Sequence, residues 1–145
     1  MTRKLKERPY GDGRYTVAGL RSFIMAALRQ KSSRWAPKQK AKIAARDGSL
    51  INPKTGRQNI ASKCHLCEKR ILESESELDH IDPCVPVDGF FYDCCTGFLG
   101  YNWSVVIENM FCEADGYMVL CHDCHTEKSN DENELRRGYA KKSKI

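Results

Sequence analysis

The apolar residues of this chain fall into a few short periodic segments separated by polar stretches. Apolar residues at helical spacing predict an amphipathic helix that is capped by Thr16 and runs to about Lys31. Its expected core face contains Val17, Leu20, Ile24, Ala27 and Leu28. A second, more cationic helix is predicted from Pro37 to about Gly48, and a third over residues 103–111.

The remaining pattern predicts short strands beside two cysteine pairs. We expect a turn over residues 52–57, a strand within 71–81 and a strand over 117–120. Residues 83–102 are rich in Pro, Gly, Cys and aromatic residues and are expected to form a loop. A last helix is expected from 125 to about 137. This order of elements predicts an α+β fold.

The charge is distributed unevenly along the chain. Residues 1–63 carry 16 Lys and Arg against three acidic residues, whereas residues 64–145 carry 8 against 16. The first part therefore has a formal charge of +13 and the second of −8, which favours a polyanion-binding segment joined to an acidic core. The alternative is an ordinary solvated surface. The candidate DNA contacts in the basic part are Arg34, Lys38, Lys40, Lys42 and Arg46, with Trp35 as a candidate for base or sugar contact.

The eight cysteines are interpreted through the expected compartment. No apolar run approaches the ~20 residues of a membrane span, and no secretory signal pattern follows Met1. We therefore expect a protein of a reducing cytoplasm, without membrane partners. In that setting, cysteines are metal ligands or buried thiols rather than a disulfide framework.

Two Cys-x-x-Cys pairs provide the strongest motif. Cys64, Cys67, Cys121 and Cys124 supply four thiolates, the complete tetrahedral set for a structural Zn²⁺. The alternatives are four ordinary buried cysteines or a redox role for one pair. The histidines inside the pairs, His65 and His122, are not needed as ligands. The other cysteines, at 84, 94, 95 and 112, lack this paired spacing and are expected to be mostly buried thiols.

Three further residues form a candidate acid–base and metal site. Asp79 and His80 lie between the cysteine pairs, and His125 directly follows the second pair. A neutral imidazole can take a proton from water near neutral pH, and carboxylate with imidazole can hold a hard cation. Asp82 is either a further supporting carboxylate or a solvated turn residue. These residue types suit hydrolysis of a phosphodiester.

The three motifs together resemble the zinc-containing HNH endonuclease family, in particular small members from tailed bacteriophages. The resemblance covers residues 64–128 and rests on Cys64-x-x-Cys67, on Leu78-Asp79-His80-Ile81-Asp82-Pro83, and on Leu120-Cys121-x-x-Cys124-His125-x-x-Lys128. It implies a ββα-metal fold in which His80 is the general base. It also implies that Asp79 and His125 bind a catalytic Mg²⁺ or Mn²⁺ and that Lys128 contacts a phosphate.

The sequence departs from the family at one position. Many zinc-containing members have a central Asn five residues before the third zinc cysteine, and this Asn orients the loop that carries the base. Here Gly116 occupies that position, with Asn102 and Asn109 further upstream. The departure keeps a second hypothesis open, a catalytically weak DNA- or protein-binding factor such as a phage packaging accessory or an inhibitor of a host protein. An RNA-directed nuclease or RNA binder is a third hypothesis.

The expected organisation has four parts. Residues 1–15 form a flexible basic N-terminus, 16–60 a helical basic extension, 61–138 a zinc-stapled HNH nuclease domain and 139–145 a basic tail. The expected activity is metal-dependent nicking or cleavage of DNA, with weak sequence preference, in the cytoplasm of the host cell if the protein is phage-encoded.

Overall fold

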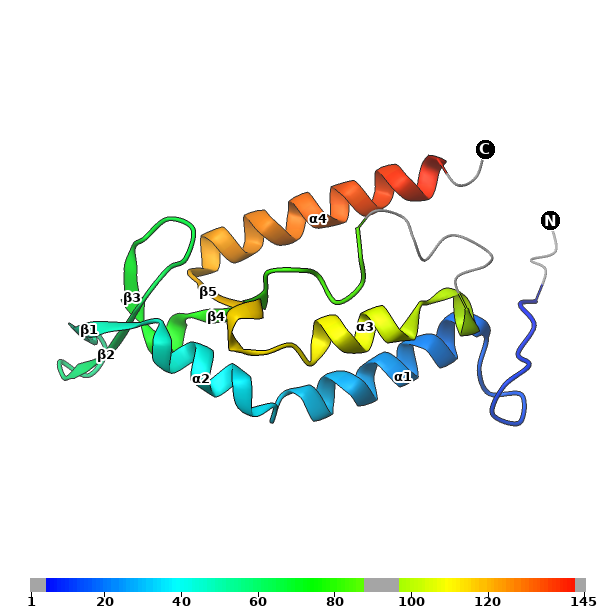
Figure 1. Ribbon diagram of the computed structural model, residues 1–145, viewed down its shortest axis with the longest axis horizontal. Helices are drawn as coiled ribbons and strands as arrows, with labels where there is room; N and C mark the ends of the chain where they lie inside the picture. The colour runs from blue at the N-terminus through cyan, green and yellow to red at the C-terminus, as the bar shows by residue number, and fades with distance from the viewer. Residues whose placement is uncertain (1–4, 88–96, 143–145) are drawn as a thin grey trace.

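The computed structural model describes residues 5–87 and 97–142 and has a mixed α+β architecture (Figure 1). The elements are α1 (Val17–Ser32), α2 (Ala36–Ala44), β1 (Arg46–Ile51), β2 (Gln58–Lys63), β3 (Arg70–Leu72), β4 (Glu77–His80), α3 (Trp103–Met110), β5 (Tyr117–Leu120) and α4 (His122–Lys142). The strands form a three-stranded sheet of order β1-β2-β3 and a separate β4-β5 pair. In Figure 1, α4 lies on one side of β4 and β5 and α2 on the other, and α1 and α3 lie together further along the molecule.

Helix α1 confirms the predicted cap and shifts the predicted face. The Thr16 hydroxyl accepts a hydrogen bond from the Gly19 amide at 3.0 Å, as expected for an N-cap. Met25, which the predicted face did not include, is the apolar residue that α1 buries most deeply, against Val106 and Met110 of α3. The apolar stripe of α1 is therefore rotated from the predicted one.

The prediction for the second helix was wrong at its C-terminal end. Helix α2 ends at Ala44, and the chain enters strand β1 at Arg46. Gly48 has φ +67°, but it lies where the β1–β2 register shifts between Arg46 and Ser49. This glycine therefore accommodates a β-bulge, which a sequence pattern does not distinguish from a helix C-cap.

The β4-β5 pair followed by α4 contains the residues for which the sequence predicted a catalytic role. The strands are antiparallel, with Asp79 opposite Met118 and His80 opposite Tyr117. Because paired residues share a face and neighbours alternate, Asp79 and His80 point to opposite faces of the pair. The chain passes from β5 directly through Cys121 into α4.

Two small apolar clusters hold these layers together. One surrounds the cysteines and contains Cys64, Met118, Leu120 and Cys121, and the other joins α1 to α3.

Residues 5–15 include a turn in which Tyr10 bridges Tyr15, whereas residues 1–4 lie outside the described part. The predictions for Cys94 and Cys95 also lie outside it. Among the described helices, none is long and apolar enough to cross a membrane.

Candidate metal centre and adjoining cleft

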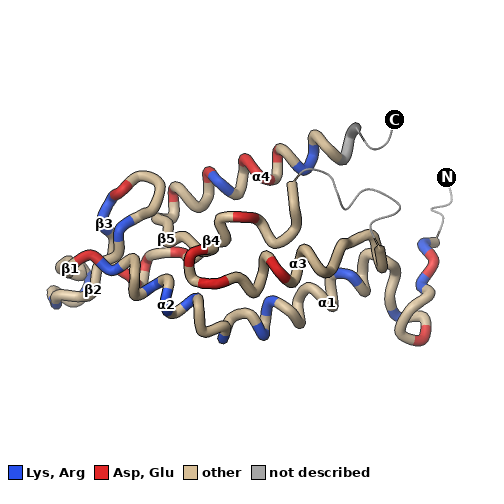
Figure 2. Tube along the Cα trace, in the orientation of Figure 1, with Lys and Arg blue, Asp and Glu red and all other residues tan. Residues whose placement is uncertain are grey.

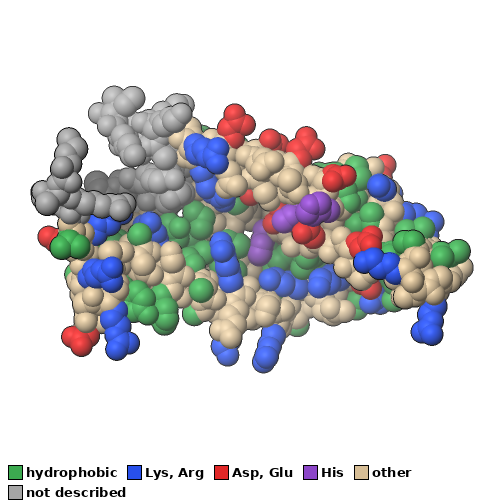
Figure 3. Space-filling model, turned by 180° about the vertical axis from the view of Figure 1, so that it is seen from behind, with side chains coloured by type: hydrophobic (Ala, Val, Ile, Leu, Met, Phe, Trp, Pro, Cys, Tyr) green, Lys and Arg blue, Asp and Glu red, His purple; other side chains and the backbone are tan. Residues whose placement is uncertain are grey.

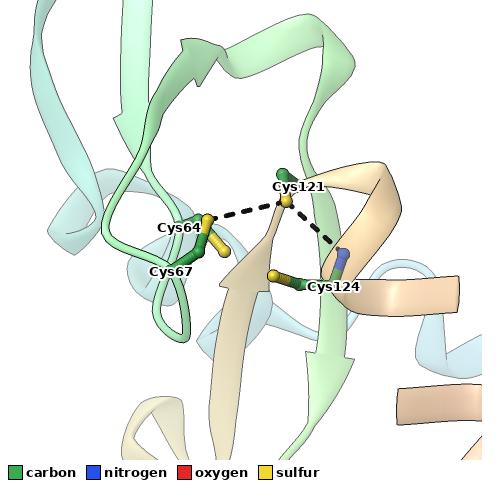
Figure 4. Close-up of side chains that lie close together, drawn as sticks. All are labelled: Cys64, Cys67, Cys121 and Cys124. Atoms are coloured by element: carbon green, nitrogen blue, oxygen red, sulfur yellow. Dashed lines mark hydrogen bonds between the residues drawn. The ribbon is translucent and has the colours of Figure 1, made fainter. Parts of the chain in front are cut away.

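The four predicted cysteines converge at one point (Figure 4). Cys64 and Cys67 come from the loop between β2 and β3, and Cys121 and Cys124 from the junction of β5 with α4. Their four sulfur atoms all lie within 4.8 Å of one another, and the Sγ atoms of Cys67 and Cys121 are 3.8 Å apart. A tetrahedral zinc with Zn–S bonds of about 2.3 Å separates its sulfurs by about 3.8 Å. The cluster could therefore hold a metal ion such as zinc.

Backbone hydrogen bonds shape both halves of the cluster before any ion is considered. In the first half, the Cys64 amide donates to the Lys69 carbonyl at 2.9 Å, and Glu68 turns the chain with φ +62°. In the second half, the Cys124 amide donates to the Cys121 sulfur at 3.5 Å. The His65 amide donates to the Val119 carbonyl at 2.8 Å and ties the first half to β5.

The electrostatics of the cluster favour at least one thiolate. Burial by itself raises the pKa of Cys64, but backbone hydrogen bonds within the cluster outweigh it and lower that pKa to about 6. The adjacent Cys121 thiol, followed by burial, raises the pKa of Cys124 to about 12. Sulfurs this close cannot all carry negative charge without a cation between them, which is the electrostatic demand that a bound metal meets.

Asp79 and His125 are brought together beside the cluster. The His125 Nε2 atom lies 4.0 Å from Asp79 Oδ2, and its Nδ1 atom lies 3.1 Å from Glu77 Oε2. A histidine that binds a metal through one nitrogen usually has a carboxylate near the other, and Glu77 lies at that place beside His125, although its Oε2 atom makes no hydrogen bond within the described residues. His122 Nδ1 also lies 3.4 Å from the same Glu77 oxygen. Sequence reasoning missed Glu77.

His80 lies on the opposite face of β4 and is held by backbone. Its Nε2 atom is 3.1 Å from the Met110 carbonyl oxygen, and its ring packs on Tyr117 with centroids 4.8 Å apart. Because a carbonyl oxygen can only accept, Nε2 carries the proton and Nδ1 keeps a lone pair. Burial is the main cause that lowers the pKa of His80 below 6.5, which favours the neutral, proton-accepting form.

The cleft beside His80 has a volume of about 550 Å³ and basic residues at its walls. It is lined by Arg29 and Lys38 from the α1–α2 side and by Glu132 and Arg136 from α4. Figure 3 shows histidine side chains on this face, with acidic side chains beside them and Lys and Arg side chains below. The Cys84 thiol, 3.6 Å from both ring nitrogens of His80, closes one side.

Lys128 is ion-paired with two carboxylates, and its contact with a phosphate stays a prediction. Its ammonium lies 3.0 Å from Asp79 Oδ2 and also contacts Glu132. Burial opposes the charge, but the hydrogen bonds from Lys128 to Glu132 and Asp79 raise its pKa overall. The lysine thus neutralises the carboxylate that the sequence assigned to a divalent ion.

Gly116, which stands where the resemblance predicts an Asn, lies against the side chain of Cys112. A Cβ at Gly116 would lie 2.5 Å from the Cys112 sulfur, so an asparagine there would require the Cys112 side chain to move. The Asn109 side chain instead donates to the Pro83 carbonyl at 3.1 Å, which restrains the loop that follows His80. Its neighbour Met110 supplies the carbonyl that binds His80. Residue counting from the cysteines did not single out Asn109, because its contact with the Pro83 carbonyl joins segments that are 26 residues apart in the sequence.

The predicted basic residues divide into three groups. Lys38 lines the cleft beside His80, and Arg34, Lys40 and Lys42 are exposed on α1–α2 and the turn between them. Arg46 is instead paired with Glu73 at 3.1 Å. The Trp35 indole donates to the Cys112 carbonyl at 2.6 Å and packs on Phe111, and its contact with a base or sugar stays a prediction. Figure 2 shows the basic positions gathered along α1 and α2, opposite acidic positions on α4.

Comparison with known proteins adds no family to this geometry. No protein-family model matches the chain, and no curated protein or solved structure is significantly similar to it. The functional conclusion therefore rests on the residues themselves.

Proposed function

We propose that this protein is a metal-dependent HNH-type endonuclease that hydrolyses phosphodiester bonds in DNA. One observation carries the proposal: the β4–β5–α4 unit holds Asp79 and His125 4.0 Å apart, while it leaves His80 neutral on an open cleft. The four-cysteine cluster, as a structural zinc site, would fix the junctions between these elements. The basic walls of the cleft suit a phosphate backbone.

The chain's own residues can perform most of the proposed reaction. The Nδ1 atom of His80 would take the proton of a water molecule, whose oxygen then attacks the phosphorus. Nε2 keeps its proton and donates it in a hydrogen bond to the Met110 carbonyl, which holds the ring in that tautomer. Asp79 and His125 are the residues that would hold Mg²⁺ or Mn²⁺, and such an ion supplies charge stabilisation for the phosphate and the departing oxygen.

The test is plasmid nicking by the zinc-loaded chain. Supercoiled plasmid is incubated with Mg²⁺, with Mn²⁺, or with neither, and metal is omitted rather than chelated so that any zinc in the cluster stays bound. We expect nicked circles only with the added ion. His80→Ala should lower the rate by about 10²–10⁴-fold, the usual contribution of a general base.

The matched control is His65→Ala. His65 is exposed in the first cysteine loop, so its removal takes away an imidazole without touching the cleft. Equal loss of activity in both variants, or nicking by His80→Ala at the wild-type rate, would exclude His80 as the base.

A second candidate function is a DNA- or protein-binding factor on the same scaffold. The observation that favours it is the ammonium of Lys128, 3.0 Å from Asp79 Oδ2, where a catalytic ion would bind. In addition, the cysteines are the only group of three or more ligand atoms brought together within residues 5–87 and 97–142. A wild-type protein that binds DNA but never nicks it, with either ion, would decide for this function.

A further inference from the structure

The β1–β2 hairpin extends beyond what the cysteine cluster needs. At its base, Ala61 and Ser62 are buried, with exposed fractions of 0% and 1%. Residues 53–60 are all exposed, and β1 is the outer strand of its sheet. Each strand has six residues and therefore spans about 20 Å. Figure 1 shows this two-stranded ribbon at one end of the molecule, next to α2.

The tip of the hairpin is a closed turn that presents two cations. The Asn52 amide and carbonyl both bond across the turn, to Arg57 and Gly56 at 2.8 Å each. The Asn52 side chain also accepts from the Lys54 amide at 2.9 Å. Neither Lys54 nor Arg57 has an ion-pair partner in the described part of the chain. Their charges are thus held on an ordered turn and are available to a partner.

The outward face of the ribbon is mixed rather than purely polar. The register pairs Ser49 with Ile60 and Ile51 with Gln58, so these four side chains share one face. Ile51 is 64% exposed and Ile60 is 45% exposed. The Ser49 hydroxyl donates to the Gln58 amide oxygen at 3.1 Å, which leaves the Gln58 NH₂ donors outside this contact.

This combination fits one kind of partner best. The ribbon has no acidic residue from Gly48 to Lys63, which suits a polyanion. The major groove of B-DNA admits a two-stranded β-ribbon, and there amide donors and apolar methyl groups meet base acceptors and thymine methyls. We propose that the β1–β2 hairpin enters the major groove of duplex DNA, with Lys54 and Arg57 on the flanking phosphates. The inference rests on the proposed function and adds that the substrate is a duplex.

The experiment compares duplex and single-stranded binding by the full-length, zinc-loaded chain. Fluorescence anisotropy is measured with a short labelled duplex and with one of its strands. Lys54→Ala with Arg57→Ala should weaken duplex binding about tenfold near 0.15 M salt and reduce the salt slope by about 2, since each phosphate contact contributes about 0.9. Binding to the single strand should change less than twofold.

The matched control is Lys6→Ala with Arg137→Ala. It removes two exposed cations that lie outside the hairpin and the cleft, so duplex affinity should fall less than twofold. Thermal melting of both double variants confirms that the fold is retained. If the hairpin variant binds duplex as tightly as wild type, or loses both nucleic acids equally, the proposal is wrong and the exposed isoleucines point to a protein partner.

Groove choice has its own readout. Methyl green, which occupies the major groove, should compete with the wild-type protein for duplex, whereas netropsin, which occupies the minor groove, should not. The reverse pattern would overturn the proposal. The nuclease proposal can fail separately from the hairpin proposal. If the wild-type protein never nicks plasmid, but binds duplex selectively and loses this binding in the hairpin variant, the hairpin proposal stands and the nuclease proposal is wrong.

Discussion

The four-cysteine cluster and the cleft beside His80 are built from adjacent parts of the chain, yet they differ in how complete they are. The cluster has four sulfur ligands at distances that suit a tetrahedral ion, and backbone hydrogen bonds set both halves. The cleft has Asp79 in its lining, with His125 4.0 Å from that carboxylate but outside the lining and with Lys128 already on the carboxylate. Soft thiolates suit zinc, whereas a carboxylate and an imidazole also suit harder ions.

The comparison shows that one scaffold can separate two tasks. A closed set of four ligands stabilises a fold and leaves no open coordination position. An incomplete set of protein ligands leaves coordination positions open for water and phosphate. The charge of its ligands is then balanced by neighbouring side chains. We therefore expect changes in the cluster to act on folding and changes in the cleft to act on binding and rate.

The largest effect should follow loss of the cluster. Cys64→Ser, or removal of the metal, should abolish cooperative unfolding, because structural zinc contributes about 10–16 kcal/mol in zinc-finger peptides and small domains have only about 5–15 kcal/mol of stability. Thermal melting followed by circular dichroism measures this. Cys112→Ser is the control, since Cys112 lies outside the cluster. A metal-free chain that still melts cooperatively would show that the cluster is not needed for folding, which is the role that distinguishes it from the cleft.

The next effect concerns the residue that restrains the His80 loop. Asn109→Ala removes the hydrogen bond to the Pro83 carbonyl and should lower kcat for nicking about 100-fold, the scale expected for a misplacement of about 1 Å, with little change in KM. The stability cost should be only about 1 kcal/mol. Asn130→Ala, at an exposed position of α4, is the control. Unchanged kcat in Asn109→Ala would show that the loop needs no such restraint.

A smaller effect should appear in the pH profile. The proposed reaction requires neutral His80, and burial is the first cause that lowers the pKa of this residue below 6.5. The rate should therefore stay constant down to a pH below 6.5 and then fall as the ring is protonated. Lys38, whose charge also lowers this pKa, gives a test: Lys38→Ala should move the acidic limb to higher pH. If the acidic limb of the pH profile does not move on this substitution, the group that titrates in the profile is not His80.

The sequence predicted the cluster well and the cleft less well, for physical reasons. Two Cys-x-x-Cys turns determine their own local geometry, and β5 and the Thr16 cap follow from short-range patterns. The cleft depends on contacts between distant segments, such as Asn109 with the Pro83 carbonyl, which no local pattern encodes. The turn over residues 52–57 was predicted, but strand β1 was missed because Gly48 and the preceding alanine-rich stretch resemble a helix end.

The most direct test of the two-region comparison is Mn²⁺ binding to the zinc-loaded chain, followed by electron paramagnetic resonance. We predict one bound Mn²⁺ per chain beside one zinc, loss of the Mn²⁺ in Asp79→Asn with the zinc retained, and binding several-fold tighter in Lys128→Ala. Wild-type protein that binds no Mn²⁺, or Asp79→Asn that binds it as tightly as wild type, would contradict a metal-dependent reaction in the cleft.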